Sequence, residues 1–130
     1  MCGRYANFLT EQELIDAFEI AVIADDARLA PRYNIGPTQE TAIVVDRKEE
    51  GRSLELARWG LVPSWAKDPS IGSRMFNARA ETVAEKPSFR AAFAKRRCLV
   101  PASGYYEWRK DDAGKTPFFI HTKDGAPLAF

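Results

Sequence analysis

Apolar residues recur at helical spacing in two stretches of the chain. In the first stretch, Leu14, Ile15 and Phe18 repeat along one face, and Thr10 with Glu13 matches a capping box just before them. The sequence therefore predicts a helix over about residues 11–20. The second stretch has Phe89, Ala92 and Phe93 on one face and predicts a shorter helix over residues 88–97.

Between and after these helices, the pattern indicates strands separated by turns. Residues 41–45 are rich in β-branched side chains and predict a buried strand, which pairs with the alternating segment 54–59 across a polar turn. Proline and glycine residues predict loops over residues 30–38 and 68–72. Towards the end, strands are expected over residues 98–109 (broken at 101–104), 116–122 and 127–130.

Composition narrows the class of protein. The chain has 130 residues, of which 45% are hydrophobic and 28% charged, as in a globular domain. It has no apolar run of membrane-spanning length and no signal-peptide pattern, so a cytoplasmic protein is expected, associated with the nucleoid when bound to DNA. Cys2 and Cys98 make neither a metal pattern nor a disulfide framework, and Cys98 is expected to be a buried, inert thiol.

Charge is unevenly distributed although the net charge is only +1. Residues 11–26 carry acidic side chains and no basic ones, whereas residues 86–97 carry Lys86, Arg90, Lys95, Arg96 and Arg97 and no acidic ones. The basic run is either a solvated helix face or a contact surface for a polyanion.

The second residue has unusual chemistry. Because Cys2 is small, Met1 should be removed, and the mature chain then starts with a cysteine. Its α-amine (pKa about 7.7–8.0) and thiol (pKa about 8.5) are both partly deprotonated near neutrality. With an aldehyde, the amine forms a Schiff base and the thiol closes a thiazolidine ring. The alternative is that Cys2 is an ordinary small apolar residue at a frayed terminus.

Five ordered motifs decide between these alternatives. They are the segments 1–5 (MCGRY), 32–37 (RYNIGP), 59–65 (WGLVPSW), 76–82 (FNARAET) and 97–108 (RCLVPASGYYEW). Together they closely resemble the SOS-response-associated peptidase (SRAP) family, over essentially the whole chain. The resemblance implies a mixed α+β fold, with a curved sheet or barrel-like core and peripheral short helices. It also implies that residues 1–130 are a single domain that is incomplete at its C-terminal end.

The resemblance assigns roles to two further polar residues. Glu107 matches the family's catalytic glutamate and Asn77 its active-site asparagine, which join Cys2. From the residues alone, Glu107 is as consistent with a solvent-facing strand position, and Asn77 with a turn or cap.

Other positions match the family's DNA groove. Arg4 and Arg79 correspond to phosphate contacts, and Asn34, Pro37 and Trp65 to the loops that shape the groove. Trp65 lies between a proline and a charged loop, which favours partial exposure and stacking on a base, although a tryptophan that covers the core fits the composition equally well.

The implied function is covalent capture of abasic sites in single-stranded DNA, with a lyase side reaction and without a metal or cofactor. A thiol peptidase acting through Cys2, and a non-catalytic single-stranded DNA-binding module, are the alternatives. The family's site histidine has no counterpart here, because His121 does not match it and is expected to be a surface residue. We further expect the remaining C-terminal part of the domain, or another chain, to cover the edge formed by the last strand.

Overall fold

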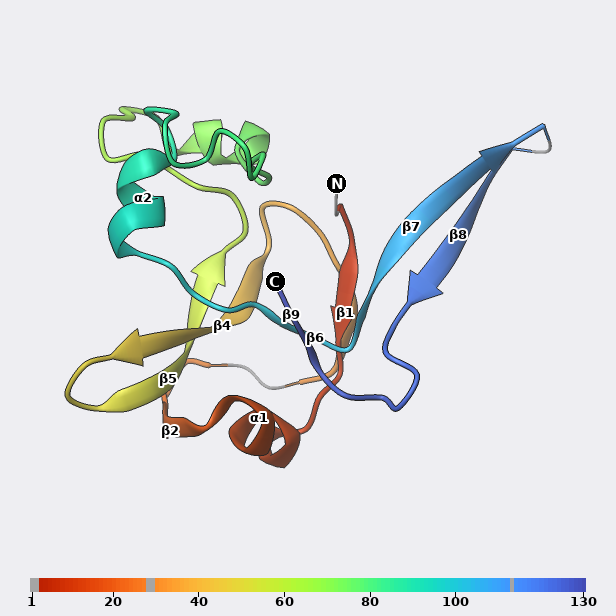
Figure 1. The fold of residues 1–130 in the computed structure, drawn as a ribbon, viewed down its shortest axis with the longest axis horizontal. Coiled ribbons are helices and arrows are strands. Elements are labelled where there is room, and N and C mark those ends of the chain that lie inside the picture. Colours follow the sequence, from red (N-terminus) through yellow and green to blue (C-terminus); the bar gives the residue numbers. More distant parts are fainter. Residues whose placement is uncertain (1–2, 28–29, 113) are drawn as a thin grey trace.

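A computed structural model describes residues 3–27, 30–112 and 114–130, which form three β-sheets with three short helices around them (Figure 1). The four-stranded sheet has the order β3 (Arg32–Ile35), β1 (Tyr5–Asn7), β7 (Gly104–Asp111) and β8 (Gly114–Ile120). The three-stranded sheet has the order β2 (Ile20–Ile23), β5 (Gly51–Arg58) and β4 (Glu40–Arg47). A two-stranded sheet pairs β6 (Pro101–Ala102) with β9 (Leu128–Ala129). The predicted mixed α+β class is confirmed, and the described strands do not close into a barrel.

Helix α1 (Glu11–Phe18) begins as its sequence predicts. The Thr10 side chain accepts a hydrogen bond from the Glu13 backbone, and the Glu13 carboxylate accepts one from the Thr10 backbone N–H at 2.7 Å. The hydrogen bonds that the Glu13 carboxylate accepts, from the Thr10 N–H and from the Thr10 hydroxyl, hold its pKa below the usual value. The apolar face buries Leu14 and Phe18 in the first core cluster, and a left-handed Glu19 ends the helix.

The hairpin of β4 and β5 supplies the opposite wall of this cluster. Its predicted pairing is confirmed, and Val44 lies opposite Leu54, both of them buried. The strands extend further than predicted, because the register continues through polar residues to Arg47 and Gly51. Polar side chains on a strand end remain solvated, so hydrophobicity does not mark where the ladder stops.

Three segments differ from the sequence prediction. The predicted loop 30–38 contains β3, which pairs antiparallel with β1, with Ile35 opposite Tyr5. Residues 20–23 form the unpredicted strand β2, parallel to β5. The predicted loop 68–72 forms the 3-10 helix η1 (Pro69–Arg74), which Asp68 caps. In the first two cases, a partner strand distant in the sequence decides the conformation of a short segment.

A second core cluster packs against the N-terminal strand β1. Tyr5, Ile35 and Ala102 are buried in it, and the Tyr5 hydroxyl shares a hydrogen bond with the Thr41 hydroxyl on β4. The strand expected at residues 127–130 forms. Phe130 exchanges backbone hydrogen bonds of 3.0 and 2.9 Å with Val100, and its ring packs on Tyr5 and Tyr105.

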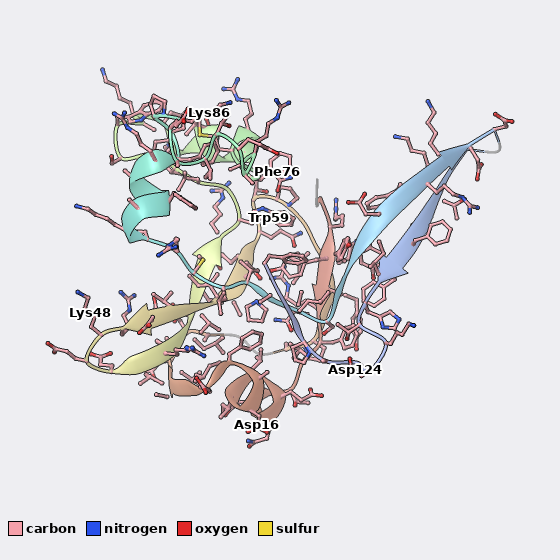
Figure 2. The ribbon with its side chains drawn as sticks, viewed as in Figure 1. Asp16, Lys48, Trp59, Phe76, Lys86 and Asp124 are labelled. Atoms are coloured by element: carbon pink, nitrogen blue, oxygen red, sulfur yellow. The ribbon has the colours of Figure 1, made fainter. Side chains whose placement is uncertain are left out.

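The two charged runs lie at opposite ends of the molecule. Figure 2 shows Asp16 on α1 at one end and Lys86, just before helix α2 (Arg90–Lys95), at the other. Every basic side chain of the run 86–97 is exposed. Helix α2 is shorter than predicted but contains Ala92 and Phe93 as expected. No helix in the described part of the chain is long and apolar enough to cross a membrane.

Candidate functional site

Strand register brings the start of the chain beside Glu107. On β1 and β7, Tyr5 lies opposite Tyr105 and Ala6 opposite Gly104, and the Tyr106 N–H donates to the Arg4 carbonyl at 2.9 Å. Continuing this antiparallel register places Gly3 opposite Glu107. Met1 and Cys2 lie outside the described residues, but Gly3 directly follows Cys2 in the chain.

Glu107 lies on the face of the sheet that carries an aromatic cluster. Side chains alternate along a strand, so Glu107 shares its face with Tyr105. The Tyr105 ring contacts Phe130, which contacts Tyr5 at the same centroid distance, 5.8 Å. Glu107 itself is half-buried. It is therefore held at the edge of an apolar surface, next to the beginning of the chain.

Asn77 lines a cavity on the same side of the sheet. The cavity has a volume of about 490 Å³, and Tyr5, Trp59, Phe76 and Phe130 contribute to its largely apolar wall. The Trp59 indole N–H donates to the Phe76 carbonyl at 2.7 Å, which anchors the segment just before Asn77 (Figure 2). Tyr5 belongs both to the cavity wall and to the aromatic cluster. The cavity beside Asn77 and the aromatic surface beside Glu107 are therefore continuous with each other.

Arg4 and Asn34 form a pair on neighbouring strands. The Arg4 guanidinium donates to the Asn34 amide oxygen at 3.1 Å. It also lies over Gly36, where an added Cβ would be 3.1 Å from the guanidinium carbon. Pro37 follows at once and is half-buried. Three of the predicted groove residues thus come together, with the exposed guanidinium oriented by an amide.

Trp65 and Arg79 lie elsewhere, on the segment between β5 and α2. In Figure 1 this segment and the β7–β8 hairpin lie on opposite sides of the first described residues. The Trp65 side chain is 57% exposed, so the prediction of partial exposure is confirmed and a core-covering role is wrong. Arg79 is exposed, and its carbonyl accepts hydrogen bonds from the Thr82 and Val83 N–H groups.

The Asp68 carboxylate caps the 3-10 helix η1, which begins shortly after Trp65. It accepts hydrogen bonds from the Ser70 hydroxyl at 2.5 Å and from the Ser70 N–H at 2.9 Å. These bonds, with the charge of nearby Arg74, hold the pKa of Asp68 below its usual value. Asp68, Arg74 and Trp65 line a shallow hollow of about 350 Å³.

The prediction for Cys98 is wrong. The residue is exposed rather than buried, because its neighbour Leu99 is also exposed and is joined to Val44 by an isolated bridge. Partial burial still raises the pKa of the Cys98 thiol. His121 is exposed as expected, with its Nδ1 atom 2.7 Å from the Thr122 carbonyl oxygen.

Sequence reasoning missed two residues of the site. Tyr5 and Trp59 line the cavity beside Asn77, and their rings meet edge to face at 5.6 Å. Both residues belong to the five sequence motifs, but only their tertiary contact shows that they line the same cavity wall. No group of three His, Cys, Asp or Glu side chains within residues 3–27, 30–112 and 114–130 is arranged to hold a metal ion.

Comparisons with known proteins place this chain in a family. The model of the SOS response associated peptidase (SRAP) family matches residues 1–130. The abasic site processing protein YoaM of Bacillus subtilis is 40% identical over 131 aligned residues, which cover 100% of this chain and 57% of that protein. The abasic site processing protein YedK of Escherichia coli is 31% identical, over 98% of this chain and 57% of its own length.

The fold of this chain is also similar to that of solved structures. A crystal structure of a protein from Bordetella bronchiseptica has a TM-score of 0.80 and 25% identity, and the match covers 98% of this chain and 61% of that one. The chain thus spans somewhat more than half the length of the curated relatives it matches. With the family model matching along its full length, the chain belongs to the SOS response associated peptidase (SRAP) family.

Proposed function

We propose that this chain captures abasic sites in single-stranded DNA as a covalent adduct at Cys2. The observation that carries the proposal is the strand register, which puts Gly3 opposite Glu107 and so brings an acid–base group to the beginning of the chain. The names of the relatives YoaM and YedK as abasic site processing proteins support the same substrate.

Residues of this chain can supply each step from the ring-opened aldehyde onward. The α-amine of Cys2 adds to the aldehyde carbon of the ring-opened deoxyribose, and the resulting hemiaminal loses water to give a Schiff base. The thiol sulfur then adds to the same carbon, and its proton passes to the nitrogen, which closes a thiazolidine ring. Glu107 delivers a proton to the departing hydroxyl and accepts protons from the nucleophiles. If the thiol does not add, the Schiff base instead permits strand cleavage, which is a lyase reaction.

The other site residues bind and orient the DNA strand. Asn77 donates to and accepts from sugar or amine groups without titrating, beside an apolar cavity that limits access of water. The exposed guanidinium groups of Arg4 and Arg79 suit phosphate oxygens, and Trp65 offers an exposed ring to a base.

Intact mass spectrometry tests the proposal directly. The chain is incubated with a single-stranded oligonucleotide that contains one abasic site, and the adduct should have the combined mass of protein and DNA less one water. A preparation that retains Met1 should give no heat-stable adduct, because the thiol and the α-amine then belong to different residues. Absence of an adduct with the processed chain would refute the proposal.

The family's name favours a second candidate, a peptidase in which the Cys2 thiolate attacks a peptide carbonyl. Self-removal of Met1 is its simplest form. A panel of peptide substrates distinguishes it from DNA capture, since only a peptidase releases cleaved peptides. A non-catalytic DNA-binding module would give neither adduct nor peptide products, although it would still bind the strand.

Replacing Glu107 with Gln should slow adduct formation by about 100-fold, because the amide keeps the shape of the side chain but transfers no proton. The rate is measured under single-turnover conditions by gel shift after heating. The matched control is Glu49→Gln, at the exposed turn between β4 and β5, which should react at the normal rate. An unchanged rate for Glu107→Gln would remove Glu107 from the mechanism.

Replacing Arg79 with Ala should reduce the salt dependence of DNA binding. Each phosphate contact releases counterions and contributes about 0.7 to the slope of log K against log salt for a single strand, so the slope should fall by about that amount. The slope is measured by fluorescence anisotropy at salt concentrations from about 50 to about 300 mM. Lys48→Ala, at the tip of the β4–β5 hairpin, is the control, and an equal change in both variants would contradict a specific phosphate contact.

A further inference from the structure

The outer face of the four-stranded sheet carries aromatic rings that the covalent chemistry does not use. Tyr105 and Tyr5 face the core, so Tyr106 and its cross-strand partner Phe119 lie on the other face. The Phe119 ring lies close against β7, since a Cβ added to Gly104 would be 2.4 Å from its Cζ atom. From Phe119 the rings continue in both directions along the sheet. We call Tyr33, Phe8, Phe119 and His121 the aromatic row.

Two of the three ring contacts in the aromatic row are stacked, and the contact between them is tilted. The Tyr33 and Phe8 rings are stacked, with centroids 5.4 Å apart and an angle of 23°. Phe8 and Phe119 follow at 6.4 Å and 35°, and Phe119 stacks on His121 at 5.6 Å and 27°. Tyr33 ends the row, and its side chain is 63% exposed. A further flat ring can therefore extend the stack at Tyr33.

Hydrogen bonds hold the backbone beneath these rings. The Tyr106 hydroxyl donates to the Tyr33 carbonyl at 2.9 Å, and the Phe8 N–H donates to the Ser103 hydroxyl at 3.0 Å. The rings are thus positioned before any ligand arrives, which lowers the entropy lost on binding. A recess of about 320 Å³ adjoins the row and is lined by Phe8, Ser103, Phe119 and His121.

The row begins beside the proposed phosphate contact. Tyr33 precedes Asn34, whose amide oxygen accepts the hydrogen bond from Arg4. Arg4 lies on the outer face, because Tyr5 next to it points into the core. A phosphate bound at Arg4 would therefore bring the DNA strand close to Tyr33, the neighbour of Asn34 on β3. This continuity, together with the positive charge at its start, favours a nucleic acid over an apolar peptide as the occupant.

We propose that the aromatic row is a stacking subsite for an undamaged nucleobase next to the abasic nucleotide, with Tyr33 as its platform. This inference rests on the proposed function, because the abasic nucleotide at Cys2 determines which bases reach Tyr33. Base stacking on an aromatic side chain tolerates any base, so the subsite adds affinity without sequence preference.

The test places 2-aminopurine at successive positions on either side of the abasic site and measures its fluorescence on binding. Stacking should quench the probe at one neighbouring position in the unaltered chain. Tyr33→Trp keeps a flat aromatic ring and should retain the quenching. Tyr33→Leu keeps an apolar side chain without the ring, should lose the quenching, and should weaken binding on the order of tenfold. Val22→Ala, which trims an exposed apolar side chain on the other sheet, should change neither.

Adduct yield at saturating DNA, measured on the same samples, separates this inference from the proposed function. Normal adduct formation with quenching that does not depend on Tyr33 would overturn the stacking subsite alone. Loss of all adduct in the unaltered chain, with Tyr33-dependent quenching retained, would refute covalent capture alone. If Tyr33→Leu converts a dimer to a monomer in sedimentation, or lowers the unfolding midpoint without changing the quenching, the row packs against protein and the subsite is overturned.

Discussion

Replacing Cys2 with Ala is expected to abolish the heat-stable adduct completely. Alanine retains the α-amine, so the Schiff base with the abasic aldehyde still forms, but no thiol is present to close the ring. The Schiff base then hydrolyses or leads to strand cleavage. We therefore expect no adduct after heating, an adduct that borohydride can trap, and more cleaved DNA than with the unaltered chain. Denaturing gels of the labelled strand measure all three products.

Cys98→Ala is the matched control for this experiment. Cys98 is the other thiol of the chain and is exposed, but it has no adjacent α-amine, and partial burial raises its pKa and lowers its thiolate fraction. Its replacement should leave the adduct yield unchanged. A heat-stable adduct in Cys2→Ala that disappears in the double variant would identify Cys98 as the nucleophile and refute the role of Cys2.

Replacing Gly60 with Ala should have the largest effect on stability. Gly60 has a φ of +140°, which a residue with a side chain rarely adopts, and an added Cβ would lie 2.4 Å from the Gly72 carbonyl oxygen. The clash is between backbone segments, so no side-chain rotation relieves it. Strain and overpacking each cost about 1–3 kcal/mol, and we expect a loss of about 3–5 kcal/mol in the free energy of unfolding. Urea denaturation measures it.

The same substitution should also disturb the site. Gly72 belongs to η1, and the Leu61 N–H donates at 3.0 Å to the carbonyl of Met75, two residues before Asn77. Displacing η1 therefore moves the segment that places Asn77 on the cavity wall. Gly125→Ala is the control, since its φ is +76° but the space around it is open, so it should cost only about 1–2 kcal/mol. Equal losses for the two variants would show that backbone strain, and not the contact with η1, dominates.

The elements that the sequence predicted correctly are those whose signals are local. The capping box of Thr10 and Glu13 and the apolar spacing after it lie within one helix, and the β4–β5 hairpin joins neighbours through a short turn. Strand β3 was predicted as a loop because its partner β1 lies far away in the sequence and the prolines on either side of it, Pro31 and Pro37, indicate a turn. Burial of Ile35 against Tyr5 outweighs this local preference.

The residues of the candidate site likewise fall into those that the sequence identified and those that only the structure revealed. Motif residues identify Glu107, Asn77, Arg4 and Asn34, and the pairing of Arg4 with Asn34 agrees with a shared role. No sequence pattern indicates that Tyr5 and Trp59 form a wall beside Asn77, or that Tyr33 ends a stack of rings. The exposure of Cys98 was likewise mispredicted, because an apolar run does not reveal whether anything packs over it.

By itself, the sequence determined the chemistry available to this protein and its family. A cysteine at position 2, a glutamate among aromatic residues and a set of arginines are properties of residue identity, and they need no coordinates. The tertiary structure decided where these groups meet. Burial of Tyr5 against Tyr105, and the hydrogen bond between Arg4 and Tyr106, set a register in which Glu107 lies opposite Gly3. A shift of one residue would turn every side chain of β1 to the other face, so the energy of packing, which only the folded chain has, selects the arrangement of the site.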